Sequence, residues 1–238
     1  MIIHGRNTVE EALKLDLVKL LHIKVNSTFD VAAYPVEKRT YGPKEFEHYF
    51  GQEAQGIAAE IKDMEPKNFD KVLDKILENG PVVILDRIFD PHNYGAIVRA
   101  ANCFGIKTVM VGFSKQSPIT AAVCKASSGT IFHTLITGAV NTATALKTLK
   151  DKGYKAYAAD VDGKTELRDA KFDEKSVIIM GSEGKGIRPA LLELADVHVK
   201  IPMSGDIDSL NVSQSAAVIM YEFTRDRSVK TAGLSENS

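Results

Sequence analysis

The chain has 238 residues, 44% of them hydrophobic, which is enough to bury a core in one large domain or in a small domain beside a larger one. Its formal net charge of −1 indicates no particular partner, and no apolar run approaches the ~18–20 residues that cross a bilayer. The first residues lack the basic-then-apolar order of a signal peptide, and Cys103 and Cys124 have no metal-ligand spacing. We therefore expect a cytoplasmic protein without a metal site or a membrane partner.

The first 66 residues predict a small α/β unit. Thr8-Val9-Glu10-Glu11 fits a capping box, in which the Thr hydroxyl and the second Glu satisfy each other's backbone N–H groups, and a helix follows to about Leu15. Two strands, 20–25 and 55–61, and a short helix, 44–50, complete the unit. The charged segment 62–70 contains Pro66 and predicts a linker to a second unit.

From residue 81, apolar strands alternate with helical segments, which predicts an α/β fold with a mostly parallel sheet and helices on both faces. The predicted strands are 81–88, 107–112, 131–136, 154–161, 176–181 and 198–203. The predicted helices are 69–78, 96–105, 119–129, 142–153 and 211–227. The tail, 228–238, is predicted to be disordered.

The first of three unusual loops follows the strand at 81–88, at a carboxyl end, where such sheets bind ligands. If a helix begins near Asn93, this residue is at its cap. Arg99 follows in an otherwise apolar helix. It either has an anionic partner such as phosphate, which the guanidinium fork suits, or reaches solvent from an exposed face.

The second and third loops follow the last two strands. Gly181, Gly184 and Gly186 allow the backbone to approach a ligand, but the segment matches neither a P-loop nor G-x-G-x-x-G. Ser209 or Asn211 suits the cap of the final helix. Together the loops show no catalytic triad, metal cluster or acid/base pair, which favours binding of a small cofactor by backbone groups.

Residues 91–150 carry basic side chains and no Asp or Glu. Such a stretch either forms a local positive field or is a scatter of solvated lysines. The basic residues are Arg99, Lys107, Lys115, Lys125, Lys147 and Lys150.

Three segments together resemble the signature motifs of the SpoU (TrmH-like) RNA 2′-O-ribose methyltransferases of the SPOUT superfamily. They are N-x-G-x-[IV]-x-R at 93–99, [IM]-G-S-E-G-x-G at 180–186 and I-P-M-x-x-x-x-x-S-L-N-V-S at 201–213. The likeness spans about residues 83–225. HGRNTVEEAL (4–13) and QGIAAEI (55–61) more weakly resemble the small RNA-binding domain that precedes the catalytic domain in many members.

This resemblance implies a substrate RNA-binding domain over 1–66 and a methyltransferase domain with a C-terminal trefoil knot over 67–238. It implies S-adenosylmethionine as the cofactor, RNA as the substrate and a homodimer. The implied cofactor contacts are Gly181, Ile201 and Leu210, joined by Gly184, Gly186 and Met203. The implied catalytic group is Asn93, Arg99, Glu183, Ser209 and Asn211. Because an arginine is effectively always protonated, we expect Arg99 to hold an RNA phosphate rather than act as a base.

The resemblance further implies methylation of a guanosine in 23S ribosomal RNA, with tRNA as the runner-up. Residues 1–66 hold 8 basic and 11 acidic residues, so we expect this unit to select shaped or single-stranded RNA by specific contacts. Two other classes stay open. One is a non-catalytic RNA-binding protein with a vestigial cofactor pocket. The other is a nucleotide-dependent oxidoreductase, disfavoured because no G-x-G-x-x-G follows the first strand of the second unit.

Overall fold

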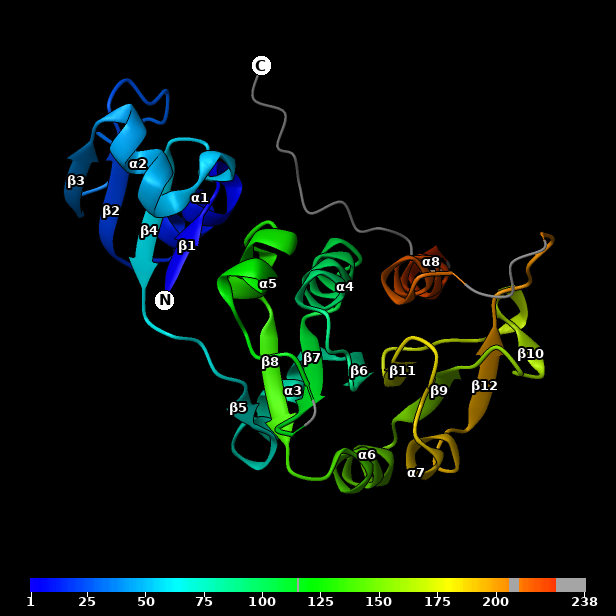
Figure 1. The fold of residues 1–238 in the computed structure, drawn as a ribbon. Coiled ribbons are helices and arrows are strands. Elements are labelled where there is room, and N and C mark those ends of the chain that lie inside the picture. Colours follow the sequence, from blue (N-terminus) through cyan, green and yellow to red (C-terminus); the bar gives the residue numbers. More distant parts are fainter. Residues whose placement is uncertain (115, 206–209, 226–238) are drawn as a thin grey trace, which may run out of the picture.

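The computed structural model describes residues 1–114, 116–205 and 210–225, which form two sheets with helices (Figure 1). The smaller sheet has the order β1-β4-β2-β3, and the larger sheet has the order β10-β12-β9-β11-β6-β7-β8-β5. The strands are β1 (Ile2–His4), β2 (Val18–Lys24), β3 (Glu37–Tyr41), β4 (Ile57–Ile61), β5 (Lys67–Asn68), β6 (Val82–Asp86), β7 (Thr108–Gly112), β8 (Leu135–Ala139), β9 (Lys155–Ala159), β10 (Thr165–Glu166), β11 (Ser176–Gly181) and β12 (Val197–Lys200). The helices are α1 (Arg6–Lys14), α2 (Pro43–Phe50), α3 (Leu73–Asn79), α4 (Pro91–Cys103), α5 (Ala121–Ala126), α6 (Thr142–Asp151), α7 (Pro189–Leu192) and α8 (Val212–Arg225).

The larger sheet confirms the predicted parallel arrangement. Throughout the described part of the chain its strands pair in parallel, with β6 between β11 and β7. The five residues of β6 are all buried, as expected for a strand covered on both faces. No helix among the described residues is long and apolar enough to cross a membrane.

Alternate side chains of the central strands enter two hydrophobic clusters. Val83 and Leu85 of β6 lie in the cluster that contains α4, α5 and α8, whereas Val82 and Ile84 lie in the cluster that contains α3, α6 and α7. Figure 1 shows α4, α5 and α8 on one side of the sheet and α6 and α7 on the other. The carboxyl ends of the strands are therefore bordered by two helical layers.

The N-terminal unit packs directly on α5 and on the 3₁₀ helix Thr130–His133. Its buried residues Ile3, Val9 and Ala12 belong to the same hydrophobic cluster as the α4–α5 layer. Glu11 Oε2 lies 2.7 Å from His133 Nε2, which adds a polar contact at this junction. Gly129 has φ +82, and a Cβ there would meet Glu11 Cβ at 2.8 Å, so the two units approach closely at this turn.

The capping box predicted at Thr8 is wrong. Helix α1 begins at Arg6 after Gly5, whose φ of +91 makes the turn into the helix, and no side chain caps it. Thr8 is instead a buried residue inside the helix, and its hydroxyl donates to the Cys124 carbonyl oxygen at 3.5 Å. The hydroxyl of Thr8 therefore contacts α5 and does not cap the helix.

Other elements also differ from the prediction. Strand β3 was missed because four of its five residues are exposed, so it lacks an apolar pattern. The strand predicted at 131–136 begins at Leu135, since 130–133 continue from the Gly129 turn as a 3₁₀ helix. Within the predicted linker, Lys67 and Asn68 form β5 and pair with β8.

Candidate functional site

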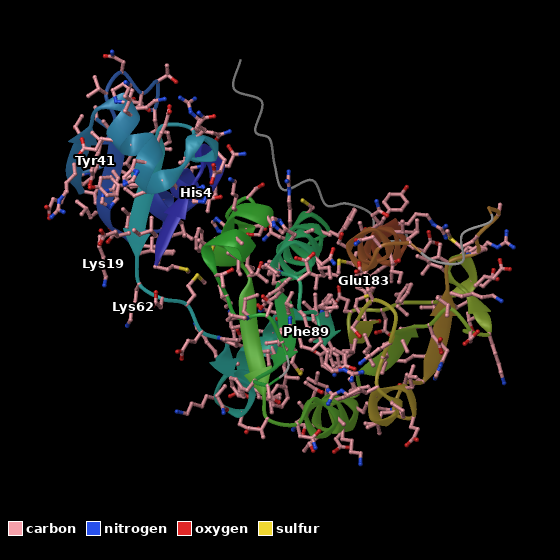
Figure 2. All side chains as sticks on the ribbon, viewed as in Figure 1. His4, Lys19, Tyr41, Lys62, Phe89 and Glu183 are labelled. Atoms are coloured by element: carbon pink, nitrogen blue, oxygen red, sulfur yellow. The ribbon has the colours of Figure 1, made fainter. Side chains whose placement is uncertain are left out.

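Three side chains from distant segments meet at the carboxyl edge of the larger sheet. The Asn93 amide nitrogen donates to Glu183 Oε1 at 3.1 Å. The Asn211 amide nitrogen donates to Asn93 Oδ1 at 3.1 Å and to Glu183 Oε1 at 2.5 Å. The cluster therefore joins α4, the loop after β11 and the start of α8, which are the three segments singled out in the sequence. Figure 2 shows Glu183 at this edge, next to α8.

Helix α4 places Asn93 in its first turn rather than at its cap. The helix begins at Pro91, and the Asp90 side chain caps it by accepting the His92 N–H at 2.9 Å. Asn93 is only 8% exposed, and its side chain is committed to Glu183 and Asn211. The cap predicted for Asn93 is wrong because Asp90, three residues earlier, has that role.

Gly95, two residues later in the same motif, serves packing. A Cβ on this residue would lie 2.6 Å from Ala126 Cβ and 2.6 Å from the Val123 carbonyl oxygen. Only glycine allows α4 to approach α5 this closely. The glycine of this motif thus positions the helix that bears Asn93.

Glu183 stands at the tip of a tight hairpin. The Ser182 N–H donates to the Gly186 carbonyl at 3.1 Å, and the Gly186 N–H donates back at 2.9 Å. At Gly181 an added Cβ would lie 2.3 Å from the Gly186 carbonyl carbon, so this glycine is required by the hairpin itself. Gly184 and Gly186 have positive φ, and no atom of the described residues lies within 4 Å of a Cβ built on either, so within this part of the chain a ligand can reach their backbone.

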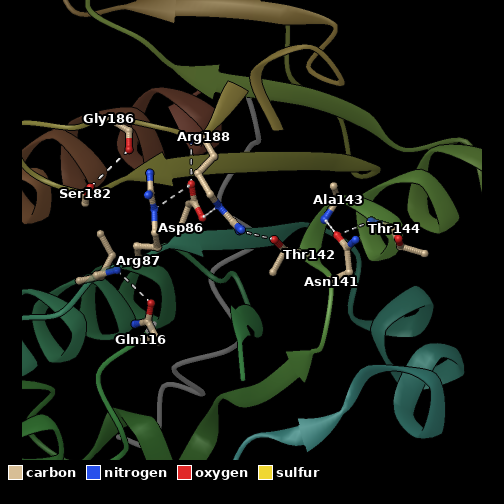
Figure 3. Close-up of polar contacts among 11 residues, drawn as sticks. Asp86, Arg87, Gln116, Asn141, Thr142, Ala143, Thr144, Ser182, Gly186 and Arg188 are labelled. Atoms are coloured by element: carbon tan, nitrogen blue, oxygen red, sulfur yellow. Dashed lines mark hydrogen bonds and ion pairs between the residues drawn. The ribbon is translucent and has the colours of Figure 1, made fainter. Parts of the chain in front are cut away.

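A buried ion pair anchors the far end of this hairpin, and the sequence did not reveal it. The Asp86 side chain is fully buried at the end of β6. Its Oδ1 accepts from Arg188 Nε at 2.6 Å and its Oδ2 from the Arg188 backbone N–H at 2.8 Å. Arg188 Nη2 also donates to Thr142 Oγ1 at 2.8 Å (Figure 3). The only available sequence signal was a carboxylate directly after four apolar strand residues.

Asn211 caps the final helix and also belongs to the cluster. Its Oδ1 accepts from the Ser213 N–H at 2.9 Å and from Ser213 Oγ at 2.6 Å, while its amide nitrogen contacts Asn93 and Glu183. The predicted catalytic residue Ser209 lies outside the described residues, as does the tail 228–238. Ile201 and Leu210 are half-buried, whereas Met203 is 40% exposed.

Arg99 is not part of the hydrogen-bonded cluster. It lies on the exposed face of α4, and among the described residues no hydrogen bond or ion pair involves it. Of the two interpretations of this residue, the structure supports an exposed guanidinium rather than a buried one with a partner.

The basic stretch 91–150 does not form one surface. Lys147 and Lys150 lie on α6, across the sheet from Arg99 on α4 (Figure 1). Lys150 is also paired with Asp196, at 2.8 Å. Of the two interpretations of this stretch, a single positive field is therefore wrong, because α4 and α6 cover opposite faces of the sheet.

The site combines amide and carboxylate groups with accessible glycine backbone. Among the described residues, no group of three or more His, Cys, Asp or Glu side chains could hold a metal ion. The arrangement can orient a ligand by hydrogen bonds and leaves the Gly184 and Gly186 backbone open to it. It contains no nucleophile with an adjacent base within the described cluster.

Comparison with known proteins identifies relatives of the chain. The SpoU rRNA Methylase family matches residues 80–221. A protein of Staphylococcus epidermidis named as a TrmH family tRNA/rRNA methyltransferase is 36% identical over 176 residues, which are 73% of this chain and 71% of that protein.

Solved structures extend the likeness to nearly the whole chain. A Porphyromonas gingivalis structure described as an RNA methyltransferase of the TrmH family aligns with a TM-score of 0.76 and 26% identity, over 94% of this chain and 89% of that one. The SpoU methyltransferase AviRb of Streptomyces viridochromogenes, solved with the cofactor AdoMet, aligns with a TM-score of 0.81 and 20% identity, over 95% and 90% of the two chains. The second likeness concerns the fold alone.

Proposed function

The chain belongs to the SpoU rRNA methylase family of RNA methyltransferases, and we propose that it transfers a methyl group from S-adenosylmethionine to a ribose 2′-hydroxyl of RNA. The observation that carries this proposal is the hydrogen-bonded cluster of Asn93, Glu183 and Asn211. It unites the three motif segments at the edge of the sheet where parallel α/β folds bind ligands.

The residues around the cluster fit the cofactor. Bound there, S-adenosylmethionine supplies an activated methyl group, and the protein supplies orientation and electrostatics. We assign its binding to the backbones of Gly181, Ile201 and Leu210, with Gly184, Gly186 and Met203 completing the pocket. The open space above the Gly184 and Gly186 backbone supports this assignment.

We assign the catalytic roles as follows. Glu183 holds the side chains of Asn93 and Asn211 in a fixed orientation, and these amides position the reacting ribose. Arg99, exposed on α4, holds an RNA phosphate, and its own positive charge beside the target hydroxyl lowers the hydroxyl's pKa, which favours loss of the proton to solvent. Ser209 completes this catalytic group in the proposal.

The remaining features of the proposal concern the RNA and the assembly. We propose a guanosine of 23S ribosomal RNA as the target, residues 1–66 as a substrate RNA-binding domain, and 67–238 as a methyltransferase domain with a trefoil knot. We also propose a cytoplasmic homodimer that packs through α8, where Val218 and Tyr221 are 40% and 57% exposed. Large apolar side chains exposed together on one helix suit such an interface.

Three measurements test the proposed function. Isothermal titration of the purified protein with S-adenosylmethionine should show binding, and Arg99→Ala should keep that binding while losing methyl transfer. An Arg99→Ala protein that methylates at a near-normal rate would disprove the assigned role. Mapping of ribose methylation in total RNA from a deletion strain identifies the nucleotide, and a lost site in tRNA instead of 23S RNA would redirect the proposal.

A further inference from the structure

Arg87 has an unusual backbone conformation beside the candidate site. It directly follows β6, and its φ is +63. For residues other than glycine this left-handed region costs about 1–2 kcal/mol, and residues held in it concentrate at functional sites. A glycine would adopt this turn without strain. We therefore expect the side chain of Arg87 to have a function that offsets the strain.

The Arg87 side chain has little to bind within the protein. Its Nε is buried, and it makes no hydrogen bond to any described residue. The distance from this Nε to Asp86 Oδ2 is 3.8 Å, which is an ion-pair distance but too long for a hydrogen bond. Arg188 already satisfies the Asp86 carboxylate at 2.6 and 2.8 Å. Two guanidinium groups thus face one carboxylate, which leaves a local surplus of one positive charge.

The position of Arg87 connects this charge to the proposed cofactor pocket. Asp86 is the register partner of Gly181, so Arg87 emerges where the 182–186 hairpin begins. Figure 3 shows its side chain pointing from the end of β6 toward Ser182 and Gly186. The Glu183 carboxylate on the same hairpin accepts from two amide groups, and no ion pair joins it to Arg87 in the described part of the chain.

We propose that Arg87 binds an oxyanion of a ligand held at this edge of the sheet, either the carboxylate of the cofactor or a phosphate of the RNA. This inference rests on the proposed function, which supplies both oxyanions. The guanidinium fork matches carboxylate and phosphate equally well. The backbone strain and the missing hydrogen bond are then explained by a partner that arrives with the ligand.

The test compares Arg87→Gly with Lys164→Gly, a matched loss of one positive charge at an exposed loop position. Each protein is titrated with S-adenosylmethionine, with 5′-methylthioadenosine, which lacks the carboxylate, and with protein-free ribosomal RNA at two salt concentrations. The urea midpoint of each variant is measured as well. Because glycine tolerates φ +63, Arg87→Gly should remain folded with a midpoint near that of the wild type.

Loss of one hydrogen bond to a charged group corresponds to about a tenfold or greater fall in affinity. If the cofactor carboxylate is the partner, Arg87→Gly loses this affinity for S-adenosylmethionine and none for 5′-methylthioadenosine. If an RNA phosphate is the partner, cofactor binding stays unchanged, RNA binding weakens, and its logarithmic salt slope falls by about one. Unchanged binding of all three ligands overturns the inference. A wild-type protein that binds no S-adenosylmethionine instead overturns the proposed function.

Discussion

Arg188→Ala should destabilise the protein strongly, because it removes the hydrogen-bonded charged partner of the buried Asp86 carboxylate and leaves only Arg87 Nε, 3.8 Å away. Removal of one partner from a buried ion pair costs about 3–5 kcal/mol. The Arg188 side chain is 42% exposed, and the backbone N–H of residue 188 still donates to Asp86 at 2.8 Å. We therefore expect a loss of about 2–3 kcal/mol in the free energy of unfolding. For a chain of 238 residues this lowers the thermal midpoint by about 5–10 °C.

Urea unfolding of the wild type and of Arg188→Ala measures this loss, with Arg168→Ala as the control. The control removes an exposed pair with Glu166, in which Arg168 is 71% exposed, and should cost less than about 1 kcal/mol. Asp86→Asn combined with Arg188→Ala should recover part of the stability, because the buried side chain that lost its hydrogen-bonded partner is then no longer charged. If Arg188→Ala costs no more than the control, or the double variant recovers nothing, the reasoning about this ion pair is wrong.

Three further predictions concern the site and its surroundings. Glu183→Gln replaces a charged hydrogen-bond acceptor, so methyl transfer should slow about tenfold or more in single-turnover assays, and an unchanged rate would contradict its role. Gly181→Ala should abolish S-adenosylmethionine binding in titrations because its Cβ would lie 2.3 Å from the hairpin backbone. Gly42→Ala should bind normally, because no described atom lies within 4 Å of a Cβ at that position. Burial raises the pKa of the Cys124 thiol to about 12, so a thiol reagent at pH 8 should modify only the exposed Cys103 in the native protein and both in urea. Two reactive thiols in the native protein would contradict that burial.

The parallel sheet was predictable because burial on both faces produces continuous apolar runs. Each predicted strand of the second unit overlaps an observed one, whereas the exposed edge strand β3 has no such run and was missed. The three site segments were also predictable as a group, since all parallel strands of one sheet have their carboxyl ends at the same edge. Their individual hydrogen bonds were not, because Asn93 and Glu183 are 90 residues apart in the chain.

Side-chain roles were harder to predict than positions. Thr8 and Asn93 both suited helix caps, yet each is a buried residue within its helix with a tertiary hydrogen bond. The apolar residues around Arg99 suggested that its side chain is buried, but Arg99 lies on the exposed face of α4. Asp86 and Arg188 have no sequence spacing that identifies them, because their contact depends on how the β11 hairpin folds back on β6.

The packing of the N-terminal unit on α5 bears on how an RNA-binding protein of this architecture could select its target nucleotide. Ile3, Val9 and Ala12 share one hydrophobic cluster with α5, so a change in the relative position of the two units would have to break this buried contact. If an RNA binds to both units, its target ribose would have to lie at a fixed distance from the RNA element that the N-terminal unit binds. In that case the buried face around Gly129, where an added Cβ would lie 2.8 Å from Glu11 Cβ, would fix this distance, rather than the connecting segment 62–66. Lengthening the segment 62–66 would therefore leave the choice of nucleotide unchanged. Disrupting the buried face between the N-terminal unit and α5 would make that choice less specific.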